Sequence, residues 1–297
     1  MSLPDRVSVL LAPNPSPMTL QGTNTYVVAG ANSCVVIDPG PEIESHLVAV
    51  ADAARARGGA RAILITHGHP DHVEGAARLR TLTGAPVWAW SREGSPVADE
   101  TLADGAVVSL GDRTLRALYT PGHRYDHLCF VLEGEGTIFT GDLVAGSGTV
   151  VIAPPEGDLN DYLASLRRVL ALEPRELGLL APGHGPVRED VRALLEGYIA
   201  HREQRERQLI TALGDEGETL TVPELVTRIY TDVAPEMWPI AAYSTLAGLM
   251  KLERDGKVAR VEGVAAEAAP VAARSPLALE GVVGRPAGLD ARWRRLA

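Results

Sequence analysis

Residues 67–72 read HGHPDH, so four residues of types that bind metal ions occur within six positions. The apolar run at residues 61–66 comes directly before them and predicts a β-strand. Side chains alternate along a strand, so His67 and His69 can point the same way, and Asp71 and His72 can face the same space from the start of a helix. Scattered polar loop residues would not give this spacing. The segment therefore predicts a metal site.

Three other strand-like segments end with a metal-binding residue type beside a glycine: TPGH at 120–123, FTGD at 139–142 and PGHG at 182–185. Glycine lets the chain turn sharply, and open α/β sheets place their sites at the carboxyl ends of strands. Imidazole and carboxylate groups without a thiolate favour zinc, with iron or manganese as alternatives. Seven ligands exceed the needs of one tetrahedral ion, so we expect two metals that share a carboxylate. The expected ligands are His67, His69, Asp71, His72, His123, Asp142 and His184.

Predicted strands and helices alternate along most of the chain, which indicates α/β layers. The predicted strands are residues 7–11, 24–29, 34–38, 61–66, 87–90, 128–132, 137–140 and 178–181. The predicted helices of the same region are residues 41–58, 73–83, 159–172 and 188–208. We place a catalytic domain at residues 1–205.

The next part of the chain predicts a winged-helix-like domain at residues 206–263. Helical patterns at 209–213, 222–230 and 241–255 are followed by a strand or hairpin pattern at 256–264. A DNA reader would carry basic residues on its second helix and wing, yet residues 206–263 hold 6 basic and 10 acidic residues. A structural or dimerising role is therefore favoured, which leaves a homodimer open. Residues 264–297 form a tail of unknown order, with Trp293 as a candidate anchor.

Composition narrows the class of protein. Apolar residues make up 45% and charged residues 22% of 297 residues, which is typical of a folded globular chain. No apolar stretch approaches the roughly 20 residues that span a bilayer, and no export signal is evident. Cys34 and Cys129 lie in apolar segments, which indicates reduced core residues and a cytoplasmic location. The net charge of -10 counts against binding to a phosphate backbone.

The HxHxDH segment with its separate His, Asp and His resembles the metallo-β-lactamase superfamily over about residues 24–187. The segments GTNTY at 22–26, residues 120–127 and GHGP at 183–186, with the winged-helix-like end, resemble the beta-lactamase-like protein 2 family up to about residue 263. The resemblance implies an αββα sandwich, with two mixed sheets facing each other, helices outside and two metals at one edge.

The resemblance also implies a role for each ligand. His67, His69 and His123 would bind one metal, Asp71, His72 and His184 the other, and Asp142 would bridge them. The implied chemistry is hydrolysis by a hydroxide held between the metals, with Asp71 orienting it and moving a proton to the leaving group. Asp71 and Asp142 are therefore the expected catalytic residues.

Other residues have less defined roles. His127 orients a ligand, contacts the substrate, or is simply a polar residue at the entrance of a strand. Asp38 is expected to support the metal loop and not to be a ligand. Four residues are candidate substrate contacts by resemblance alone, although Tyr26 is better explained as a core aromatic: Asn24, Tyr26, Arg124 and Tyr125.

Several relatives fit the residues poorly. True β-lactamases lack a bridging aspartate at the position of Asp142, and flavodiiron proteins carry Glu at that of His69. Glyoxalase II has a helical C-terminus instead of a winged-helix-like one. Persulfide dioxygenases share much of the ligand set and are not excluded by the sequence. Fungal and bacterial relatives include thioesterases, whereas animal members are single-strand endoribonucleases. Aromatic residues are only 4% of the chain, and RNA binding favours stacking aromatics and basic grooves. We expect a small acyl substrate (an ester, thioester or lactone), with single-stranded RNA as the alternative and a non-catalytic binding or regulatory protein as another class.

Overall fold

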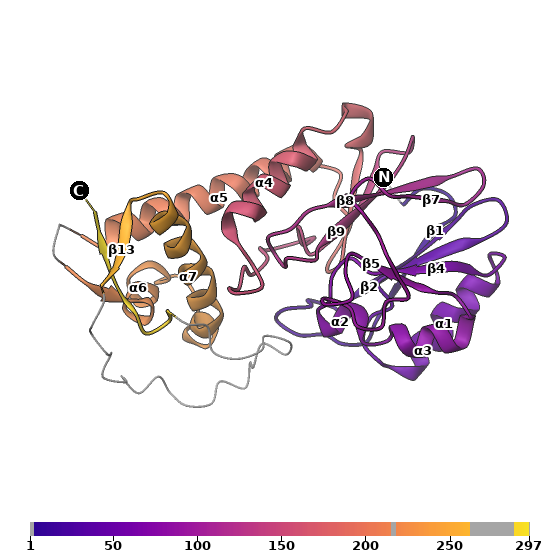
Figure 1. The fold of residues 1–297 in the computed structure, drawn as a ribbon, viewed down its shortest axis with the longest axis horizontal. Helices are drawn as coiled ribbons and strands as arrows, with labels where there is room; N and C mark the ends of the chain where they lie inside the picture. Colours follow the sequence, from indigo (N-terminus) through magenta and orange to yellow (C-terminus); the bar gives the residue numbers. More distant parts are fainter. Residues whose placement is uncertain (1–2, 215–217, 262–287, 297) are drawn as a thin grey trace.

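The computed structural model, which describes residues 3–214, 218–261 and 288–296, contains two mixed β-sheets that face each other (Figure 1). In spatial order the first sheet comprises β1 (Val7–Leu11), β2 (Asn24–Ala29), β3 (Cys34–Ile37), β4 (Ala60–Leu64), β5 (Val87–Ala89) and β6 (Glu100–Thr101). The second comprises β11 (Leu179–Pro182), β10 (Thr137–Gly141), β9 (Leu128–Leu132), β8 (Thr114–Tyr119) and β7 (Val107–Ser109). Strands β3–β6 run parallel, as do β10 and β11, and the other neighbours are antiparallel.

The layers form because the central strands bury both faces. In β3, Val35 and Ile37 point into the core between the sheets, whereas Cys34 and Val36 point to the outer layer. Helices α1 (Glu44–Arg55) and α3 (Ala76–Thr83) cover the first sheet, and α4 (Leu159–Leu170) and α5 (Val191–Ala212) cover the second. This arrangement confirms the predicted α/β class and αββα sandwich. Both cysteines are buried and unpaired.

Helix α5 continues from the sandwich into a C-terminal domain (Figure 1). The separate helix predicted at residues 209–213 is therefore wrong. The charged run at 201–208 lies within the helix, because the buried face that begins at Val191 continues through Arg202 to Leu209. The domain adds α6 (Val222–Ile229), α7 (Trp238–Arg254) and a sheet in the order β12 (Leu220–Thr221), β14 (Arg292–Arg295), β13 (Val258–Val261).

The part of the expected tail that the structure describes belongs to this small sheet. Trp293 of β14 is fully buried and pairs with Leu220 on one side and Arg260 on the other. Residues 264–287 of the tail lie outside the described residues. The remaining short helices are α2 (Pro70–Val73) and the 3-10 turns Pro174–Glu176 and Pro235–Met237. No helix in the described parts of the chain has both the length and the apolar character needed to cross a membrane.

Candidate metal centre

The seven predicted ligands come together at one edge of the sandwich, where strands from both sheets end. His67 follows β4, His123 follows β8, Asp142 follows β10 and His184 follows β11. Helix α2 begins at Pro70, with His69 at its N-cap position, so Asp71 lies in its first turn. All four strands present their carboxyl ends at this edge, as the sequence motifs predict.

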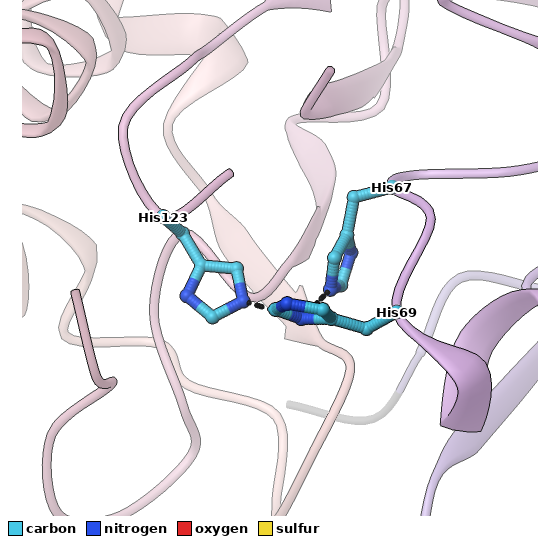
Figure 2. Close-up of side chains that lie close together, drawn as sticks. All are labelled: His67, His69 and His123. Atoms are coloured by element: carbon cyan, nitrogen blue, oxygen red, sulfur yellow. Dashed lines mark hydrogen bonds between the residues drawn. The ribbon is translucent and has the colours of Figure 1, made fainter. Parts of the chain in front are cut away.

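Three histidines form the first cluster, and Figure 2 shows their rings converging. Nε2 of His67 lies 2.9 Å from Nδ1 of His69, and Nε2 of His123 lies 3.0 Å from the same atom. Each ring therefore directs one nitrogen to a common point.

Asp71, His72 and His184 form the second cluster. Nε2 of His184 lies 3.2 Å from Nε2 of His72 and 3.2 Å from Oδ2 of Asp71. Asp142 lies between the clusters. Its Oδ1 is 3.5 Å from Nε2 of both His72 and His184, and its Oδ2 is 3.7 Å from Nε2 of His123. The two oxygens of one carboxylate therefore face different clusters.

Hydrogen bonds to groups outside the clusters determine which nitrogen is protonated in four of the five histidine rings. Nδ1 of His72 donates to Oδ2 of Asp38 over 2.7 Å. The Thr66 hydroxyl also donates to Oδ2 of Asp38, so it accepts a hydrogen bond from Nδ1 of His67 over 3.0 Å. Protonated Nδ1 atoms leave both Nε2 lone pairs pointing inward, which is the arrangement of metal-bound histidines.

Backbone carbonyls fix the protonated nitrogen of two other ligands, His123 and His184. Nδ1 of His123 donates to the carbonyl of Val151 over 2.8 Å, and Nδ1 of His184 donates to that of Gly22 over 3.3 Å. Four imidazoles thus offer Nε2, whereas His69 offers Nδ1.

The donor set fits divalent cations. Two unprotonated nitrogens about 3 Å apart repel each other unless a cation or a proton lies between them, and Oδ1 of Asp142 is buried without a hydrogen bond. Burial lowers the pKa of His123, which favours the neutral ring that binds a metal. Burial also disfavours charge on His184, but Asp142 and Asp71 outweigh it and raise its pKa to about 10. These carboxylates create the negative potential that attracts a cation.

His127 does not reach the centre of either cluster. Its Nε2 accepts the backbone N–H of Asp142 over 3.1 Å, so its Nδ1 carries the proton and donates to the Thr120 hydroxyl over 2.9 Å. The ring is fully buried, and burial lowers its pKa to about 3. His127 therefore orients the segment that carries Asp142.

Asn24 and Tyr26 are buried and face the protein rather than the open side of the centre. The Tyr26 hydroxyl donates to the Pro182 carbonyl over 2.8 Å, and the Asn24 amide donates to the carbonyls of Pro182 and Gly185. Both residues hold the segment on which His184 lies. Tyr26 thus lies as the core aromatic that the sequence favoured, and Asn24, a candidate substrate contact, lies in a supporting position.

Arg124 and Tyr125 lie beside the first cluster. The Arg124 guanidinium is 5.0 Å from the centre of the Tyr125 ring and lies 3.5 Å from Asp126 and 3.4 Å from Glu156. Glu156 was not among the predicted site residues, although its Oε2 is 3.9 Å from Nε2 of His69. No local motif marks this residue, because its proximity depends on the path of the loop before α4.

Comparisons with known proteins agree with this geometry. Residues 18–184 match the Metallo-beta-lactamase superfamily, and residues 221–275 match the Beta-lactamase associated winged helix domain. The chain is 33% identical over 270 residues to the Beta-lactamase-like protein 2 homolog of Drosophila melanogaster, covering 84% of this chain and 88% of that protein. It is 35% identical over 278 residues to the Atrochrysone carboxyl ACP thioesterase of Aspergillus fumigatus, covering 86% of this chain and 84% of that protein.

A solved structure extends the match to the whole fold. A metallo-beta-lactamase family protein from Thermus thermophilus is 22% identical and superposes with a TM-score of 0.75, covering 99% of this chain and 100% of that chain. The fold and both sequence matches confirm the resemblance. The chain therefore belongs to the metallo-beta-lactamase superfamily of hydrolases, which bind divalent metal ions, and carries the winged-helix domain associated with that family.

Proposed function

We propose that the chain is a two-metal hydrolase that cleaves an ester, thioester or lactone carbonyl in a small acyl substrate. The observation that carries the proposal is the position of Asp142, whose two oxygens face two separate clusters of nitrogen donors. Zinc suits these ligands first, and iron or manganese suits the same nitrogen and oxygen donors. The free, buried cysteines favour a reducing cytoplasm.

The chain's own residues divide the work of hydrolysis. When bound, two divalent ions supply Lewis acidity and lower the pKa of a water molecule toward neutrality. Asp142 fixes the spacing of the two ligand clusters. The Asp71 side chain is 29% exposed and so reaches the open side of the site, where it can accept a proton from the attacking water. The carbonyl carbon gains the hydroxyl, its bond to the oxygen or sulfur leaving group breaks, and Asp71 returns the proton to that group.

The distribution of positive charge supports a carbonyl substrate over RNA. Arg124, beside the metal centre, is only 6% exposed and is flanked by Asp126 and Glu156. On the helix that would read nucleic acid, Lys251 pairs with Glu206 at 3.0 Å and with Asp255 at 2.8 Å. Paired cations contribute little to phosphate binding, since that binding depends on free Lys and Arg. The thioesterase name of a 35% identical relative points the same way.

A paired assay tests the proposal. Zinc-loaded protein is incubated with an acyl-CoA thioester and with a labelled single-stranded RNA. We expect thioester cleavage, intact RNA, and a roughly 100-fold or greater loss of rate in Asp71→Ala. Asp112→Ala is the control, because Asp112 pairs with Arg6 on the surface and should leave the rate unchanged.

Two results would contradict the proposal. If the wild type cleaves RNA and Asp71→Ala does not, the bond that the enzyme hydrolyses would be a phosphodiester instead of a carbonyl ester or thioester. If the metal-loaded protein cleaves none of these substrates (the thioester, simple esters, lactones and RNA), a non-catalytic binding role would be favoured.

A further inference from the structure

The segment of residues 149–152 supports His123 but has few hydrogen bonds of its own. It lies between Asp142 and α4, and among the described residues it makes no backbone-to-backbone hydrogen bond. Val150 and Ile152 anchor it by burying their side chains in the core beneath the second sheet. The directions of its carbonyl groups therefore depend on side-chain donors. One of these donors is His123, whose Nδ1 bonds the Val151 carbonyl.

Arg202 of α5 holds the neighbouring peptide group. Its terminal NH2 group donates to the Val150 carbonyl over 2.5 Å and to the Thr149 hydroxyl over 3.1 Å. The residue is only 5% exposed, and its guanidinium lies 5.4 Å from the centre of the Tyr162 ring. Charge-assisted hydrogen bonds of this kind are stronger than neutral ones, so Arg202 restrains the segment that carries the acceptor of His123.

Helix α5 reaches the same region at a second point. Tyr198 lies one helical turn before Arg202, and its hydroxyl accepts the backbone N–H of Ala145 over 3.0 Å. The segment between Asp142 and α4 is thus tied to one face of α5.

The same helix extends into the winged-helix domain. Leu209, seven residues beyond Arg202, is buried in the core of that domain. Arg254, the last residue of α7, forms an ion pair with Asp158, and the backbone N–H of Asp158 donates to the Gly122 carbonyl beside His123. The C-terminal domain therefore contacts the surroundings of His123 by two routes.

We propose that Arg202 is a positioning residue for the metal ligand His123, and that the winged-helix domain thereby tunes the affinity of the ion held by His67, His69 and His123. The inference rests on the proposed metal centre. Loss of the Arg202 contacts frees the 149–152 segment, so the Val151 carbonyl no longer fixes the direction of the His123 ring. Groups that orient a metal-bound histidine typically contribute a factor of about 10–100 to metal affinity.

The test measures zinc stoichiometry and both dissociation constants in the full chain, by competition with a chromogenic chelator. Arg202→Met keeps much of the side-chain volume and removes the donors. Arg205→Met is the matched control, because Arg205 is on the same helix but bonds Gln208 and covers the Tyr230 ring. We expect Arg202→Met to weaken one of the two sites about 10–100-fold, and Arg205→Met to weaken neither.

A spectroscopic readout separates positioning from general loss of stability. In spectra of 15N-labelled imidazoles, the Nδ1–H signal of His123, assigned with His123→Gln, should shift and exchange faster with water in Arg202→Met, while that of His184 stays unchanged. If Arg202→Met does not fold, Arg202→Lys replaces it. Lysine keeps the charge and can donate to one of the two acceptors, so we expect a smaller loss at the same site.

The outcomes distinguish this inference from the proposed function. Two wild-type metal affinities in the folded Arg202 variant, or equal losses in Arg205→Met, would overturn the role of Arg202. A wild-type chain that binds two ions but hydrolyses no substrate would overturn the proposed function, while a selective loss in Arg202→Met would still support the inference.

Discussion

Asp38 connects the two metal clusters through hydrogen bonds that its carboxylate accepts. Oδ1 accepts the backbone N–H of Thr66 over 2.8 Å, and Oδ2 accepts the Thr66 hydroxyl and Nδ1 of His72, each over 2.7 Å. The substitution Asp38→Asn keeps the size of the side chain and replaces one acceptor with an NH2 donor. Asp38 has a φ of 51°, a left-handed conformation that asparagine also tolerates, so the change isolates the hydrogen bonding.

The expected magnitude follows from the three donors around the carboxylate. Whichever way the new amide is turned, its NH2 faces either the Thr66 N–H or the donors at Oδ2, and at least one buried donor loses its acceptor. An unpaired buried donor costs about 1–3 kcal/mol of unfolding free energy. If His72 loses its acceptor, metal affinity should fall about 10–100-fold, or roughly 1.4–2.7 kcal/mol.

Two assays check this prediction. Denaturant unfolding in the presence of a chelator gives the change in stability, and zinc competition gives the change in affinity. Asp112→Asn serves as the control, because Asp112 is a surface partner of Arg6. An Asp38→Asn protein that has the wild-type stability and also binds both ions as tightly as the wild type would refute the role assigned to this carboxylate.

Further predictions concern His127, metal removal and Trp293. His127→Leu leaves the Asp142 N–H without its acceptor, and denaturant unfolding should show a loss of about 1–3 kcal/mol that His127→Gln partly restores. Burial lowers the His127 pKa to about 3, so the unfolded chain binds this proton before the folded chain does as pH falls below about 6.5. Between pH 6.5 and 3, the unfolding free energy of the metal-free wild type should therefore fall by up to about 1.4 kcal/mol per pH unit more than that of His127→Gln. Equal pH dependence of the unfolding free energy in the two proteins would contradict this. Chelation should abolish hydrolysis and added zinc should restore it; full activity without metal would rule out the mechanism. Trp293→Ala should lower the unfolding free energy by about 3–5 kcal/mol, and limited proteolysis should cleave the C-terminal domain before the sandwich. Cleavage of the sandwich first would contradict this prediction.

The metal ligands could be predicted because they follow strands, either directly or through the short helix α2, and belong to residue types with few other uses in such clusters. The hydrogen-bond partners that orient these ligands could not be predicted. The acceptor of His123 is a backbone carbonyl 28 residues away, and any residue type can supply a carbonyl. Arg202 lies 52 residues beyond the Val150 carbonyl that it bonds, and a charged helix gives no sign that one arginine is buried.

The strands that were predicted well have apolar side chains on both faces, as in β2, β3 and β9. No range was predicted for β7 or β8, although the TPGH motif implied a strand before His123. Arg116 interrupts the apolar pattern of β8, and β7 is only 3 residues long. The helix predicted at residues 73–83 is interrupted, because α2 ends at Val73 and α3 begins at Ala76. Gly75 lies in the interruption and packs closely against Leu47 of α1, where an added Cβ would lie 2.7 Å from the Leu47 side chain. Such interruptions depend on tertiary contacts that a local pattern does not contain.

The proposed function depends most on the presence of two ions bridged by Asp142. Anomalous diffraction from crystals of the zinc-loaded chain tests it directly. We expect two peaks about 3.5–4 Å apart, one beside His67, His69 and His123 and the other beside Asp71, His72 and His184, with Asp142 between them. A single peak at saturating zinc, or two peaks without Asp142 between them, would contradict it.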